Sequence, residues 1–439
     1  MRRRSLLAGA AAGLMAGALP LRRVFAQEAS AKPIRIGLLH DLSGPFAGAG
    51  SVPLSVGAQL AIDHVNSQGG ILGKYKIEPV SADSQSKVDV AINEAERLIA
   101  QEKVDIVLGV YSSAQAVPLA AKMDEAKKIL WINSAIATAV LKDRHLHYVF
   151  RPTTQSDAYG EAAISLLGEN SKPKLGIDPA ALKIALIDED GPYGTGVQQA
   201  DQRFSDEKHV GKIVLKESYS ASAPDLSSLV TKLKRAHPDV IIHAGYNPDI
   251  TLFLRQAREA GLHFKTLIGN GAGYSQLDKL RATFGTDVDD FFNIDPAPAQ
   301  ILDAGKLAPG IGDLIKIMVD GYKAKTQATE VPTHVSMGFN NTWILLAKVL
   351  PVAVGKYGGA DPDAVRKAAL EVDVPLGGTL QGYGVKFAPP EDAMSGQNVR
   401  ALPVVMQNRG KDITVVWPSQ ISTAAPVMPL PASSPYAMG

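Results

Sequence analysis

Serine side chains that could bind a carboxylate lie at the start of a predicted helix. Tyr111, Ser112 and Ser113 stand between a short apolar run, 105–108, and a helical pattern that begins at Ala114. The first amides of a helix have no partner within it, and together with a nearby hydroxyl they form a site for an anionic group. A serine at this position can also cap its own helix. Because capping and binding are compatible, we expect Ser113 to bind the ligand, with Tyr111 and Ser112 beside it.

Small residues follow the next apolar run, 129–132. Ser134, Ala135 and Ala137 belong to the segment 133–138. Small side chains let the backbone approach a ligand and present its amide and carbonyl groups. The plainer interpretation is a tight turn. We expect Ala135 and Ala137 to supply main-chain contacts, with Ser134 as a neighbour.

Two tyrosines stand at the ends of later strand-like runs. Tyr193 follows the acidic segment 188–190, and Tyr246 lies in the segment 245–249. A tyrosine joins an apolar ring to a polar tip, which suits a ligand that is half carboxylate and half hydrocarbon. The acids beside Tyr193 more often cap the helix that follows. The sequence therefore predicts a small-molecule site with aromatic walls.

The residue patterns of common enzymes and cofactor sites are missing. Gly269, Gly271 and Gly273 alternate, but a dinucleotide fingerprint has another spacing and lies in the first strand–helix turn. There is no phosphate-binding loop and no Gly-x-Ser-x-Gly elbow. His145 and His147 could hold a metal only if a third ligand folded nearby. A receptor needs only a concave pocket with a few polar groups, so the sequence favours a receptor without metal or cofactor, and a hydrolase is the remote alternative.

The elements that must position these residues alternate between strand-like and helical patterns. Such alternation is typical of parallel, doubly wound sheets. The first apolar run, 34–39, feeds a Gly-rich turn, and a helix begins near Pro53. The series restarts after a crossing segment at 149–152, and Pro-containing residues 295–298 form a return crossing. Further strands are expected at 76–82, 105–108, 129–132, 183–187, 214–219, 240–243 and 266–268, and helices at 88–99, 114–126, 194–208, 224–236 and 250–260. The predicted fold class is α/β, with two doubly wound parallel-sheet lobes.

Composition is that of an ordinary globular protein of two or three domains. The chain has 439 residues, of which 46% are hydrophobic and 20% charged. It contains no cysteine, which excludes disulfides, thiolate metal sites and a lipid anchor on cysteine. The last segment, 419–439, is rich in Pro, Ser and Ala, and we expect a flexible tail.

The amino terminus reads as an export signal over residues 1–26. Arginines 2–4 precede a short Ala/Gly/Leu run, and 24–26 offers a cleavage site. The segment 3–7 resembles a twin-arginine signal, although a general secretory signal also begins with basic residues. Loss of five arginines changes the formal charge from +1 to −4, which leaves no basic footprint for nucleic acid. The predicted location is the periplasm, and the predicted state is a free monomer.

Several stretches resemble the leucine/isoleucine/valine-binding protein family, the type I solute receptors of ABC importers. These are "DLSGPFAGAG" at 41–50, "AIDHVNSQGGILG" at 61–73 and "LRQAREAGL" at 254–262, with the Tyr193-Gly194 turn. The resemblance implies two lobes joined by three hinge crossovers that close over a ligand. It implies that Ser113 binds the ligand carboxylate, that Tyr193 and Tyr246 face the solute, and that a membrane permease and an ATPase are partners. The expected lobes are 33–150 with 295–399, and 151–294 with 400–418.

Two positions depart from the family pattern. Gly271 stands where members that bind α-amino acids carry an acid for the ammonium group, so either Asp249 or Asp83 replaces it or the ligand has no amine. Ala49 stands where some members have a large aromatic residue, which predicts a roomier pocket. Both favour a hydrophobic or aromatic carboxylate, or an amide, over leucine. A receptor that signals to a regulatory partner is the alternative to a transport function.

Overall fold

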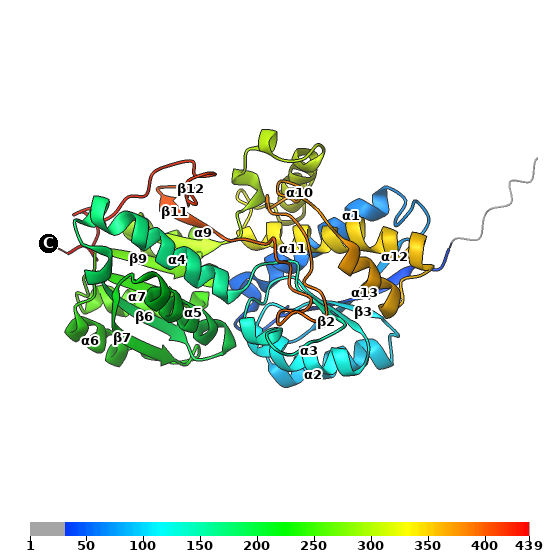
Figure 1. Ribbon diagram of the computed structural model, residues 1–439, viewed down its shortest axis with the longest axis horizontal. Coiled ribbons are helices and arrows are strands. Elements are labelled where there is room, and N and C mark those ends of the chain that lie inside the picture. Colours follow the sequence, from blue (N-terminus) through cyan, green and yellow to red (C-terminus); the bar gives the residue numbers. More distant parts are fainter. Residues whose placement is uncertain (1–30, 439) are drawn as a thin grey trace, which may run out of the picture.

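The protein has two lobes that lie side by side, as the computed structural model shows for residues 31–438 (Figure 1). Each lobe is built on its own sheet, with helices on both faces. The predicted α/β class with two lobes is therefore confirmed. The predicted signal segment, 1–26, lies outside the described residues.

The first lobe contains a parallel sheet with strand order β2-β1-β3-β4-β5. Apolar runs produce these strands because both faces of the sheet are covered. The strands are β1 (Ile34–His40), β2 (Ile77–Asp83), β3 (Ile106–Gly109), β4 (Ile129–Ile132) and β5 (Val149–Phe150).

Helices cover both faces of this first sheet. On one face lie α2 (Val88–Ala100) and α3 (Ser113–Glu125). The other face carries α1 (Val52–Ser67), α10 (Ile311–Thr326), α11 (Thr333–Ile344), α12 (Leu350–Tyr357) and α13 (Pro362–Glu371). The first lobe thus combines two stretches that are far apart in the sequence.

One helical run in the first lobe is apolar enough and long enough to cross a membrane. It extends over Thr333–Tyr357, through α11, a π-helical turn at 345–349 and α12. Within its most apolar window, 72% of the residues are buried in the protein. The composition reflects a helix packed in the core of this lobe.

The second lobe contains a mixed sheet with strand order β12-β11-β10-β9-β8-β6-β7. The first five strands along the chain pair in parallel, and β11 and β12 are antiparallel to their neighbours. The strands are β6 (Lys183–Glu189), β7 (Lys212–Tyr219), β8 (Val240–Ala244), β9 (Thr266–Asn270), β10 (Phe292–Asp295), β11 (Val404–Arg409) and β12 (Asp412–Trp417). The predicted parallel sheet is present in β6 to β10, and residues 404–417 add an antiparallel hairpin at its edge.

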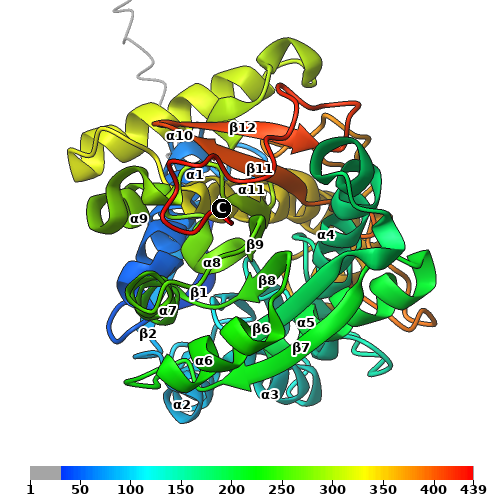
Figure 2. The same cartoon turned by 90° about the vertical axis from the view of Figure 1, so that its left-hand side faces the viewer.

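Helices also flank the second sheet on both faces, as the turned view shows (Figure 2). One face carries α4 (Ser156–Asn170) and α5 (Pro192–Lys208). The other carries α6 (Ser227–Ala236), α7 (Asn247–Glu259) and α9 (Leu277–Phe284), and the short α8 (Gly271–Tyr274) follows β9.

The chain passes between the sheets three times. It leaves the first lobe after β5, returns after β10, and enters the second lobe again before β11. The first and third crossings are hydrogen-bonded to one another. The Arg151 amide donates to the Gly396 carbonyl over 2.9 Å, and the Asn398 side-chain amide donates to the Pro152 carbonyl over 2.8 Å. The crossing strands therefore form a connected hinge, which agrees with the predicted three crossovers.

The carboxyl-terminal segment is packed against the second lobe. Tyr436 is fully buried, and its ring stacks on Phe264 with 5.6 Å between ring centroids. The Phe264 amide donates to the Tyr436 carbonyl over 2.9 Å, and Leu430 is also buried. The expectation of a flexible tail over 419–439 is therefore wrong for its described end. The two buried apolar residues, Leu430 and Tyr436, could not be recognised from the sequence, because two isolated apolar residues in a Pro-rich segment form no periodic pattern.

Candidate functional site

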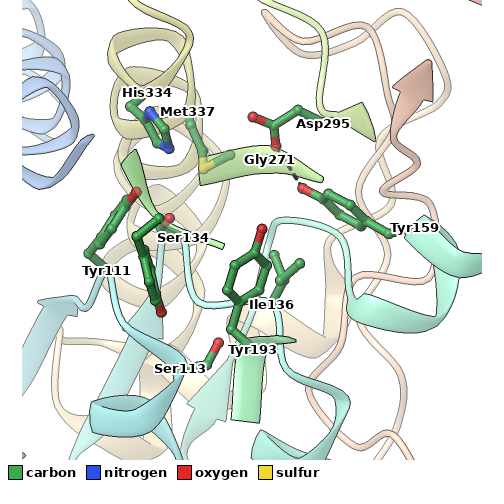
Figure 3. Close-up of a pocket in the computed structure, with 11 residues that line it drawn as sticks. Tyr111, Ser113, Ser134, Ile136, Tyr159, Tyr193, Gly271, Asp295, His334 and Met337 are labelled. Atoms are coloured by element: carbon green, nitrogen blue, oxygen red, sulfur yellow. Dashed lines mark hydrogen bonds between the residues drawn. The ribbon is translucent and has the colours of Figure 1, made fainter. Parts of the chain in front are cut away.

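A small cavity lies between the two lobes, and Figure 3 shows the side chains that line it. Its volume is about 30 Å³, which is room for a few water molecules. A larger solute therefore enters only when the lobes separate. The first lobe contributes Tyr111, Ser113, Ser134, Ile136, His334 and Met337, and the second contributes Tyr159, Tyr193, Tyr246, Gly271 and Asp295.

Ser113 lies where β3 gives way to α3. Ser112 is the N-cap residue and makes no side-chain capping bond, so Ser113 is the first residue of the helix. The Ala137 amide donates to Ser113 Oγ over 3.2 Å. This bond leaves the hydroxyl proton of Ser113 available to a ligand, at the positive end of the helix. The Ser113 corner is thus suited to an anionic group.

The loop after β4 is held by a buried arginine. Arg151 donates from Nη1 to the carbonyls of Ala135, over 3.2 Å, and of Ala137, over 2.7 Å. The Ala135 amide donates to the Val110 carbonyl over 3.3 Å. These groups hold Ser134 and Ile136 at the cavity wall. This support could not be predicted from the sequence, because Arg151 lies 14 residues or more after the alanines that it contacts, too far for a helical or strand repeat to relate them.

Aromatic side chains from both lobes form another wall of the cavity. The ring centroids of Tyr246 and Tyr193 are 5.4 Å apart, and those of Tyr246 and Tyr111 are 6.1 Å apart. Phe46 of the first lobe packs on Tyr246 with 4.3 Å between centroids. The Tyr193 hydroxyl donates to the Asn270 carbonyl over 2.7 Å, which fixes its ring. This wall offers apolar surface with few polar atoms.

Asp295 lies at the opposite end of the cavity from Ser113 (Figure 3). The Tyr159 hydroxyl donates to Asp295 Oδ1 over 2.6 Å, and the Ser275 hydroxyl donates to Oδ2. Burial raises the pKa of this carboxyl to about 6, and the two hydroxyl donors oppose that rise. Asp295 was not predicted as a site residue, because it begins the Pro-containing crossing segment 295–298.

The predicted site residues divide into two groups. Six of them line the cavity: Tyr111, Ser113, Ser134, Tyr193, Tyr246 and Gly271. Ser112, Ala135 and Ala137 are buried in the same loops but do not line it. The residues that the sequence missed are Ile136, Tyr159, Asp295, His334 and Met337.

The proposed substitutes for an acid at Gly271 lie elsewhere. Asp249 accepts from the Tyr246 amide over 2.9 Å and from the Tyr219 hydroxyl over 2.7 Å, outside the cavity lining. Asp83, the last residue of β2, accepts from the Leu42 amide over 2.9 Å and does not line the cavity. Phe46 and three tyrosines occupy the space between the lobes, and the roomier pocket expected from Ala49 stays a prediction.

Metal ligands are not gathered anywhere in residues 31–438. Within that range no three His, Cys, Asp or Glu side chains form a metal-binding group. His145 Nδ1 lies 3.3 Å from the Pro390 carbonyl, and the His147 amide donates to Asp124. The cavity contains hydroxyls, one carboxylate and aromatic rings, which suit recognition of a small organic molecule.

The sequence is similar to a known protein family and to individual proteins of that family. Residues 33–410 match the family described as periplasmic binding protein. The chain is 32% identical over 413 residues to Leu/Ile/Val-binding protein homolog 7 of Brucella abortus (strain 2308), covering 94% of this chain and 96% of that protein. It is 31% identical over 427 residues to homolog 8 of Brucella suis biovar 1 (strain 1330), covering 97% and 98%.

Solved structures show the same fold. One is the branched-chain amino acid transporter substrate-binding protein LivJ from Streptococcus pneumoniae in complex with isoleucine. It aligns with a TM-score of 0.69 at 21% identity, covering 87% of this chain and 97% of that one.

Proposed function

The chain belongs to the periplasmic binding protein family, in its Leu/Ile/Val-binding group, and from this premise we propose that it is the receptor of an ABC importer for a small carboxylate-bearing solute. Its family is one of binding proteins of branched-chain amino acid transporters. The proposed solutes are hydrophobic amino acids, aromatic or aliphatic carboxylates, and amides.

The main support for this proposal is the set of groups that line the cavity between the lobes. One end presents the Ser113 hydroxyl at the start of α3, a place that favours an anion. Tyr193 and Tyr246 supply apolar surface from the other lobe. A carboxylate with a short hydrocarbon part matches this combination of groups.

The proposed partners follow from the same assignment. A receptor of an importer delivers its solute to a membrane permease that is driven by an ATPase. Membership of a periplasmic family supports a periplasmic location, and we propose a cleaved signal over residues 1–26. We further propose that the mature protein acts as a monomer, because one chain supplies both walls of the cavity.

Calorimetric titration of Ser113→Ala tests the proposed carboxylate site. Loss of a hydrogen bond to a charged group should weaken binding by about 1.5–3 kcal/mol. Ser205→Ala is a matched control, because Ser205 is equally buried but its hydroxyl donates to the Val210 carbonyl away from the cavity. Equal affinities of the wild type and Ser113→Ala for every bound carboxylate would contradict the assignment.

A further inference from the structure

The cavity has unlike ends, and only one of them is acidic. Asp295 is the only carboxylate among the described residues that line it. The opposite end presents the hydroxyl of Ser113 at a helix start, which favours negative charge. A solute that satisfies both ends carries a negative group at one end and a positive group at the other.

Asp295 is buried without a positive partner in the described part of the chain. Its side chain is 1% exposed, and its hydrogen bonds come from the neutral hydroxyls of Tyr159 and Ser275. None of the ion pairs found among residues 31–438 involves it. A buried carboxylate without a cation is costly, and a cationic ligand group would offset that cost.

Gly271 has no side chain, which leaves room for the Asp295 carboxylate at the cavity wall. Gly271 has φ +31°, and a Cβ atom built there would lie 3.5 Å from Asp295 Oδ1. The Cβ atom alone would be in ordinary contact with the carboxylate, and a longer side chain would occupy the part of the cavity that Asp295 lines. With glycine, the edge of Asp295 is left facing the space between the lobes.

We propose that Asp295 binds the ammonium group of the solute, so that the ligand is an amino acid or another zwitterion. The ligand carboxylate lies at Ser113, its ammonium group lies at Asp295, and its side chain packs on the aromatic wall. This inference rests on the proposed function and reverses the expectation, drawn from Gly271, of a ligand without an amine.

Protonation of Asp295 should make the affinity for an amine-bearing ligand depend on pH. The ammonium group binds the ionised carboxylate, and protonation near pH 6 competes with it. Burial raises the pKa of the cavity tyrosines, and burial together with the charge of Lys279 lowers the pKa of His334 to about 4. These groups therefore stay neutral from about pH 5 to 8. The titratable groups that face Asp295 or the cavity are Tyr111, Tyr159, Tyr193, Tyr246, Tyr383 and His334.

A panel of matched ligands tests the proposal on the mature protein. Each amino acid, for example L-leucine or L-phenylalanine, is paired with its deaminated acid, 4-methylpentanoate or 3-phenylpropanoate. Thermal shift selects the best pair, and calorimetry measures it. We expect the amino acid to bind at least about tenfold tighter, a gap of roughly 1.4 kcal/mol. Its affinity should fall about tenfold from pH 7.5 to pH 5, one decade per unit below the pKa.

Variants assign these effects to Asp295. Asp295→Asn should remove most of the preference for the amine and flatten the pH profile, while the deaminated acid binds as before or better. Asp295→Glu keeps the charge and should retain part of the preference. Asp188→Asn is the matched control, since Asp188 is buried with a pKa raised to about 7 but lies outside the cavity lining. This control should keep both the preference and the pH profile.

The outcomes separate this inference from the function on which it rests. Equal binding of the two members of a pair, or an amine preference that survives in Asp295→Asn, would overturn the role of Asp295 and leave the carboxylate receptor intact. Failure of every carboxylate in the panel to bind would overturn the proposed function itself.

Discussion

Ionisation of Asp295 is coupled to folding in the ligand-free protein, because the folded state raises its pKa from 3.8 to about 6. A raised carboxyl pKa means that the folded state binds the proton more tightly than the unfolded chain does. The ionised carboxylate therefore destabilises the ligand-free protein at neutral pH. This cost diminishes as the pH falls through about 6 and is gone below the unfolded pKa.

We predict that Asp295→Asn shows this coupling. Relative to the variant, the wild type should gain about 1–2 kcal/mol of unfolding free energy between pH 8 and pH 4.5. Urea unfolding of both proteins without ligand, at several pH values, measures the gap. The difference cancels the other buried titratable groups, which both proteins share. A gap that stays constant with pH would show that folding does not shift the pKa of Asp295.

Single residues were predictable where a local pattern marks the end of a strand. Ser113 and Tyr193 each come shortly after an apolar run, where a helix begins, and both line the cavity. Asp295 and His334 escaped notice because their positions depend on how the lobes close, and no local pattern records that. Gly271 was identified correctly as a position at the cavity, but its meaning depended on the carboxylate of a distant residue.

At the scale of elements, α1 and α11 pack with their backbones in close contact. A Cβ atom on Gly57 would lie 2.2 Å from the Val335 carbonyl oxygen, and one on Gly338 would lie 2.0 Å from the Leu54 carbonyl oxygen. The two backbones therefore meet at glycines, and no side chain can be added without moving a helix. Because α11 carries His334 and Met337, this contact also sets one wall of the cavity.

We predict that Gly338→Ala destabilises the protein by about 1–3 kcal/mol, the usual cost of forcing extra volume into a packed interface. Gly355→Ala is the control. It lies in α12, and its added methyl would meet only Leu72 Cδ1 at 3.6 Å. Alanine favours helix, so this variant should be neutral or more stable by up to about 1 kcal/mol. Chemical denaturation of the two variants measures the difference, and equal stabilities would contradict the packing argument.

The order of elements could be predicted because apolar strands and amphipathic helices differ in period. The strand at 129–132 was predicted with its observed bounds. The hairpin of β11 and β12 was not recognised as strands, because β10, its antiparallel neighbour in the sheet, lies more than a hundred residues earlier in the chain. Antiparallel addition to a sheet edge depends on that distant partner, and Trp417 and Val405 show no local sign of it.

At the scale of the whole molecule, contacts across the cavity favour the closed form. Lys279 of α9 donates from Nζ to the Gly48 carbonyl in the first lobe. Phe46, from the same loop, packs on Tyr246 of the second lobe. These contacts form only when the lobes meet. A ligand that bridges Ser113 and Asp295 would add to them, so binding and closure should be linked.

We predict that Lys279→Met weakens ligand binding although Lys279 does not line the cavity. Loss of its interlobe bond, worth about 0.5–1.5 kcal/mol, reduces the fraction of closed molecules, and apparent affinity falls with that fraction, by about threefold to tenfold. Lys265→Met is the control, because Lys265 lies 3.9 Å from Asp239 within the second lobe. Small-angle scattering should show that the ligand compacts the wild type and that unliganded Lys279→Met is the more open protein. If wild-type scattering is the same with and without a bound ligand, the lobes do not close on it, and the interlobe contacts of Lys279 and Phe46 belong to a permanently closed molecule.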